Sequence, residues 1–90
     1  MDQVAILQEL ETLAADLAVE IRYEELDGRG GLCRYGDKTC IIANRALQVS
    51  ERVHLLSKEL SRFPLDDIFI RPRIRELLED RVPGPASGLI

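Results

Sequence analysis

His54 is the only histidine of the chain, and three serines lie near it in the same segment: Ser50, Ser57 and Ser61. A serine nucleophile requires a base, a third group that orients this base, and donors that stabilise the oxyanion. The residues around His54 supply no recognisable third group and no oxyanion site. We therefore interpret His54 as a partly exposed helix residue and predict no catalytic residue.

The two cysteines form a second group with potential chemistry. Gly36-Asp37 lies between them and favours a two-residue hairpin turn. This register places Cys33 opposite Cys40 and Tyr35 opposite Lys38. Two facing thiols could act as a redox switch or supply half of a soft-metal site, but they are too few ligands for structural zinc. We favour simple packing of two reduced thiols and predict no metal.

A third group consists of charged residues on residues 50–63, SERVHLLSKELSRF. This segment predicts an amphipathic helix with Ser50 as its N-cap and Pro64 as its stop. Its apolar stripe comprises Val53, Leu56, Leu60 and Phe63. The opposite side comprises Glu51, Leu55, Lys58 and Arg62, with Glu59 at its flank and within pairing distance of Arg62.

Arg71, Arg73 and Arg75 cluster at the start of a last helix that begins at Pro72 and has Ile74, Leu77 and Leu78 on its apolar face. Positive charges there oppose the helix dipole. The cluster is therefore a candidate site for an anionic group. The alternative, which we favour, is pairing with nearby acidic residues: Asp66, Asp67, Glu76 and Glu79.

The remaining elements follow from hydrophobic periodicity and turn residues. Residues 2–18 predict a helix with Ile6, Leu10, Leu13 and Leu17 on its apolar side, and residues 19–24 alternate as a strand does. A glycine-rich turn at residues 27–31 leads into the hairpin strands, residues 32–35 and 38–43. Residues 68–70 are expected to cover an edge of the core.

These elements predict an α+β fold of order αβββαα, in which a small three-stranded antiparallel sheet packs against the central helix. Residues 1–81 are expected to form a single compact domain. Residues 82–90, VPGPASGLI, are expected to be a mobile tail because Pro, Gly and Ser dominate them.

Composition excludes several classes of function. A net charge of −4, a pI near 4.9 and only two Tyr, two Phe and no Trp disfavour binding to nucleic acid or to anionic membranes. No stretch resembles an export signal or a membrane span. We therefore expect a cytoplasmic protein without a cofactor.

The order of motifs resembles the N-terminal part of the ImmA/IrrE-type metallopeptidase-like domain over residues 19–63. The resemblance rests on Gly31-Leu32-Cys33, on Ile41-Ile42-Ala43-Asn44 and on a helix that begins Ser50-Glu51-Arg52. In that family the helix carries His-Glu-x-x-His, whose histidines hold zinc and whose Glu is the general base. Here Lys58 and Arg62 replace the histidines, and only Glu59 matches. The resemblance thus implies a zincin-like scaffold without its metal site.

From these observations we predict a non-enzymatic protein-interaction or regulatory module. Because the resembling family often acts with helix-turn-helix transcription regulators, a regulator is the implied partner. The expected surface comprises Leu55, Lys58, Glu59, Arg62, Arg71 and Arg73, and charge reversal at Lys58 and Arg62 should weaken binding while leaving the melting temperature nearly unchanged. One alternative is a metal-dependent hydrolase with ligands from Cys33, Cys40, His54 and acidic residues. Another is a homodimer that buries Leu55 or residues 68–70 between copies.

Overall fold

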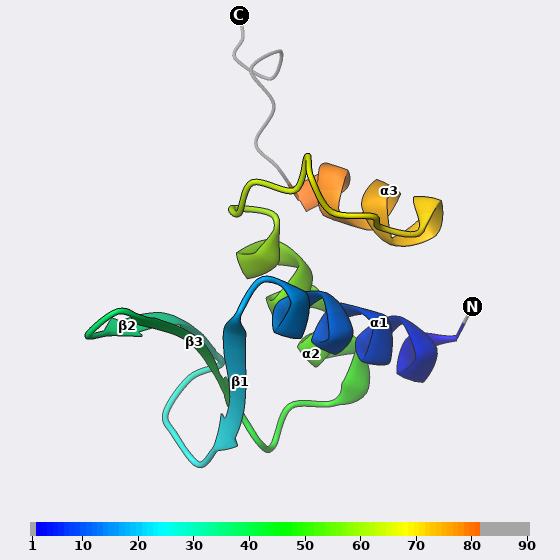
Figure 1. The fold of residues 1–90 in the computed structure, drawn as a ribbon. Helices are drawn as coiled ribbons and strands as arrows, with labels where there is room; N and C mark the ends of the chain where they lie inside the picture. Colours follow the sequence, from blue (N-terminus) through cyan, green and yellow to red (C-terminus); the bar gives the residue numbers. More distant parts are fainter. Residues whose placement is uncertain (1, 82–90) are drawn as a thin grey trace, which may run out of the picture.

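The computed structural model describes residues 2–81, so the tail predicted for residues 82–90 lies outside the described residues (Figure 1). The elements are α1 (Gln3–Asp16), β1 (Val19–Glu24), β2 (Gly30–Tyr35), β3 (Lys38–Asn44), α2 (Val49–Leu60) and α3 (Pro72–Arg81). This order confirms the predicted α+β fold, αβββαα.

The sheet is mixed, with strand order β1-β3-β2. The hairpin register is confirmed, because β2 and β3 are antiparallel with Cys33 opposite Cys40 and Tyr35 opposite Lys38. The prediction of a wholly antiparallel sheet is wrong, because β1 pairs with β3 in parallel. The hairpin turn constrains only β2 and β3, and it leaves the position of β1 to contacts distant in sequence.

Asn44, the last residue of β3, stabilises the wide connection between β1 and β2. Its side-chain amide donates to the backbone oxygens of Leu26 and Gly28, at 2.9 and 2.8 Å. The backbone amide of Asn44 donates to the oxygen of Arg29 at 2.8 Å. These bonds hold the connection across the end of β3, so that β1 and β2 lie on opposite sides of it.

Helices α1 and α2 lie side by side and pack on one face of the sheet, and α3 packs against both helices (Figure 1). The core on this face includes Val19, Ile41 and Ala43. On α1 the buried residues are Leu7, Leu10, Leu13 and Ala14, whereas the predicted Ile6 and Leu17 are only half-buried. On α3, Ile74 and Leu78 are buried as predicted, and Leu77 is half-buried.

Helix α2 begins and ends earlier than its sequence indicates. Its N-cap is Gln48, whose backbone amide donates to the Glu51 carboxylate at 2.9 Å, so Ser50 lies inside the first turn. The helix ends at Leu60, and Phe63 follows it in a half-buried position. The rest of the predicted stripe, Val53, Leu56 and Leu60, is buried as expected.

Tyr23 connects three elements. Its hydroxyl donates to Glu11 of α1 at 2.6 Å, and the Arg52 guanidinium of α2 lies 4.6 Å from its ring centroid. Burial raises the pKa of the Tyr23 phenol well above its usual value, and the hydrogen bond to Glu11 and that carboxylate's charge raise it further. The neutral phenol is therefore the form that the fold stabilises.

This shift predicts a loss of stability at high pH. Because the folded pKa exceeds the unfolded value of about 10, the stabilisation is complete below that pH and is lost as the pH rises above it. In the Tyr35→Phe variant, where Tyr23 is the only phenol, we expect no tyrosinate absorbance at about pH 11 until urea unfolds the chain. Half-ionisation near pH 10 in the folded protein would contradict this assignment.

Candidate functional site

The charged face predicted on α2 is only partly exposed. Lys58 is exposed and the Arg62 side chain is 60% exposed, but Leu55 and Glu59 are buried, at 5% and 7% exposure. The placement of Leu55 and Glu59 on an open surface is therefore corrected. Helix α2 contacts α1, the sheet and α3. More of its circumference is therefore buried than in a helix that packs against the core on one side only.

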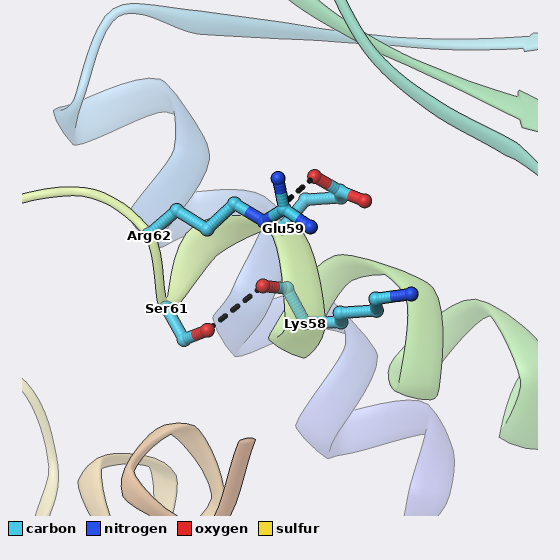
Figure 2. Close-up of polar contacts among 4 residues, drawn as sticks. All are labelled: Lys58, Glu59, Ser61 and Arg62. Atoms are coloured by element: carbon cyan, nitrogen blue, oxygen red, sulfur yellow. Dashed lines mark hydrogen bonds and ion pairs between the residues drawn. The ribbon is translucent and has the colours of Figure 1, made fainter. Parts of the chain in front are cut away.

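Glu59 and Arg62 form the ion pair that their spacing predicts. Arg62 Nε lies 3.6 Å from Glu59 Oε1, and this oxygen is buried without a hydrogen-bond partner among the described residues. Figure 2 shows Arg62 lying across Glu59, whereas Lys58 extends away from both. The resemblance predicts that Lys58 and Arg62 occupy the two histidine positions, and as cations these side chains do not fit a zinc ion. Glu59, the one residue that would match the motif, is paired with Arg62.

Ser57 of α2 and Ser61, the residue that caps its C-terminus, bond to the helix backbone. Ser57 Oγ donates to the His54 carbonyl at 3.0 Å, and Ser61 Oγ donates to the Lys58 carbonyl at 2.8 Å (Figure 2). Ser57 is fully buried, whereas His54 is exposed. A serine whose hydroxyl proton is donated to its own helix is not oriented toward a catalytic base.

Arg71 has a partner that its neighbours in sequence do not suggest. Its Nε lies 3.2 Å from Glu9 Oε2 of α1. The predicted acidic partners close to the arginine cluster form no ion pair with Arg71 or Arg73 in the described part of the chain. Arg73 is exposed, and Arg75 donates to the Ile68 carbonyl at 3.5 Å.

Phe69 is the largest apolar side chain that the described residues expose, at 85%. It lines an open groove of about 300 Å³ between α1 and the segment that enters α3. The other lining residues are Glu9, Thr12, Leu13, Asp16, Ile70, Arg71 and Ile74. We call this feature the α1 groove. It contains Arg71 of the predicted surface but none of the α2 residues.

The expectation that residues 68–70 cover the core is right for only part of the segment. Ile70 is 8% exposed and Ile68 packs partly against the core, whereas Phe69 points outward. Ile68 lies in a bend and residues 69–70 belong to no helix or strand, and this segment covers its two isoleucines while it exposes the residue between them. This alternation was the signal in the sequence that could have located the groove.

No protein-family model, no curated protein and no solved structure matches this chain. The resemblance to the ImmA/IrrE-type domain therefore remains a prediction from the motifs.

Cys33 and Cys40 lie on the sheet face opposite the helices, because Ile41 and Ala43 of β3 point into the core. Both are free thiols, with Cys40 buried and Cys33 half-buried. Burial raises the pKa of the Cys40 thiol, and the nearby Glu20 carboxylate adds to this effect. At neutral pH Cys40 is therefore a protonated, poorly nucleophilic thiol.

Residues 2–81 do not bring the alternative hydrolase ligands together. No three side chains of His, Cys, Asp or Glu in this part of the chain lie close enough to hold a metal ion. His54 lies on α2, whereas both cysteines lie on the far face of the sheet. None of the described helices has the length and apolar character that crossing a membrane requires.

Proposed function

We propose that this domain is a non-enzymatic protein-interaction module on a zincin-like scaffold that carries cations at its metal-ligand positions. The observation that supports the proposal best is Phe69, 85% exposed at the edge of the α1 groove. Following the resemblance, the proposed partner is a transcription regulator.

An exposed aromatic ring beside a groove is typical of a binding anchor. Large aromatic side chains are enriched at the centres of protein interfaces, where their truncation often costs more than about 2 kcal/mol of binding free energy. The backbone on both sides of Phe69 is held by Ile68 and Ile70, which pack against the core. The ring is thus displayed from an anchored segment, and little conformational entropy is lost on binding.

Two exposed cations at the end of α2 form a second candidate surface. Lys58 lies in the last turn of α2 and Arg62 follows its end, and both lie outside the α1 groove. Exposed charges at the rim of an interface mainly influence the rate and specificity of association. We therefore expect the Lys58 and Arg62 side chains to modulate binding and Phe69 to dominate it.

Affinity capture from a native lysate tests the proposal. We expect Phe69→Ala to reduce the captured partner at least about tenfold, and Lys58→Ala with Arg62→Ala to reduce it less. Leu32→Ala is the matched control, because Leu32 is another exposed apolar residue, at 39%, and it lies on β2. Equal capture by wild type and Phe69→Ala would reject the α1 groove as the binding surface.

Two further measurements separate the alternatives. A homodimer through Phe69 predicts a sedimentation mass that rises with concentration in wild type but not in Phe69→Ala. Leu55 needs no second copy to be covered, because it is already buried within the chain. A metal-dependent hydrolase predicts stoichiometric bound metal in the purified protein, which would overturn the proposal.

A further inference from the structure

The α1 groove has one acidic wall and an apolar floor. The wall consists of Glu9, Thr12 and Asp16, which are spaced three and four residues apart and so project from one side of α1. The floor is formed by Leu13, Ile70 and Ile74, which are buried in the core and turn one edge toward the groove. Such a combination suits a ligand with an apolar stem and a positive end.

The negative charge is greatest at the Asp16 end of this wall. Asp16 is exposed and lies in the last turn of α1, where the helix dipole is negative and where no basic residue occurs. Within residues 2–81 it takes part in none of the ion pairs. Glu9, by contrast, is already paired with Arg71. A cation bound near Asp16 would complement both its carboxylate and the helix terminus.

Phe69 adds a preference among cations. A guanidinium stacks on an aromatic face and can bond a carboxylate through two parallel N–H groups, whereas an ammonium does neither as well. Phe69 and Asp16 line the same groove, so an arginine side chain bound there would have both as neighbours. Its methylene stem would lie on the apolar floor.

We propose that the α1 groove binds an arginine side chain of the protein partner, presented in a segment with apolar neighbours. This inference rests on the proposed protein-interaction function and specifies the chemistry of the partner. An acidic partner segment is disfavoured because it would oppose Asp16 and the helix terminus. In this proposal Arg71 neutralises Glu9, so that Asp16 is the carboxylate that binds the partner's guanidinium.

The full chain can be titrated with two synthetic peptides that differ at one position. Both carry the sequence Gly-Leu-X-Leu-Gly, with X either arginine or its neutral isostere citrulline. We expect the arginine peptide to bind at least about fivefold more tightly at low salt, and the difference to shrink at about 0.5 M salt. Asp16→Asn should abolish the difference, and Phe69→Ala should weaken binding of both peptides.

Glu20→Gln is the matched control, because it removes an exposed carboxylate from β1, outside the groove. Failure of the arginine peptide to bind wild type, equal binding of the two peptides, or an unchanged preference in Asp16→Asn would each overturn the inference. The proposed protein-interaction function is rejected by a different result, namely unchanged partner capture by Phe69→Ala. Capture that depends on Phe69 but not on Asp16 would support the protein-interaction function and reject arginine binding in the groove.

Discussion

Gly30→Ala should destabilise the domain by about 3 kcal/mol or more. A methyl group added at this position would lie 1.9 Å from the backbone oxygen of Ile42 and 3.0 Å from the Cα of Ala43. The obstruction is the backbone of the central strand, which cannot move aside as a flexible side chain would. The φ angle of Gly30 is also +119°, a conformation that residues with a Cβ rarely adopt.

Gly31→Ala provides the matched control, because the next residue of β2 has nothing within 4 Å of an added Cβ. Its free energy of unfolding should remain within about 0.5 kcal/mol of wild type. Urea denaturation of the two variants tests the pairing of Gly30 with Ala43. Equal stability of Gly30→Ala and Gly31→Ala would contradict this pairing. If Gly30→Ala does not fold while Gly31→Ala does, the expectation is met.

Arg62→Glu should be the next most destabilising change, at about 2 kcal/mol. Breaking a buried ion pair costs about 3–5 kcal/mol, and this value is reduced here because the Arg62 side chain is 60% exposed. The substitution leaves Glu59, 9% exposed at its side chain, beside a second carboxylate. Lys58→Glu is the control, and we expect a change of less than about 0.5 kcal/mol because Lys58 is exposed and makes no ion pair with residues 2–81.

Reversing the charges of Lys58 and Arg62 together is therefore not expected to leave the melting temperature nearly unchanged, contrary to the prediction from the sequence alone. Helical periodicity places both residues on the same exposed side, but Arg62 is paired with the buried Glu59, whereas Lys58 is not. A double-mutant cycle with Glu59→Gln measures the coupling, since Glu59→Gln should recover most of the stability lost in Arg62→Glu. Purely additive effects would show that the two residues do not interact.

Local signals were sufficient to predict the hairpin. Gly36-Asp37 specified the turn, and the turn specified the register of Cys33 with Cys40. The direction of β1 could not be predicted in this way, because its partner lies on the far side of β2 in the sequence. Alternation identifies a strand without identifying its neighbour.

Helix faces were predicted less accurately than helix positions. In α1 the periodicity allows two adjacent stripes, and the structure selects the one that contains Leu7 and Ala14. For α2 the periodicity predicted burial on one side only, whereas contact with α1, α3 and the sheet also buries Leu55 and Glu59. The burial of a helix depends on how many neighbours it has, and a single segment does not contain this information.

Of the interaction surface expected from the sequence, only Arg71 lies in the α1 groove, and residues 68–70 were named as a binding surface only in the homodimer alternative. The remainder of the α1 groove combines Glu9 and Asp16 of α1 with Phe69, and these residues are far apart in the sequence. Their proximity depends on the packing of α3 and its preceding segment against α1. Apart from the alternation at residues 68–70, charge and periodicity indicated only whether each residue is exposed or buried, and they did not indicate that these residues share a groove.

The strand at the centre of the sheet is the last of the three to be synthesised. Strand β3 pairs with both β1 and β2, which do not pair with each other. As the chain leaves the ribosome, β1 and β2 therefore have no sheet partner until β3 begins to emerge. The β2–β3 pairing can then close locally through its two-residue turn, whereas the β1–β3 pairing must close a longer loop. Formation of the complete sheet thus depends on the arrival of β3.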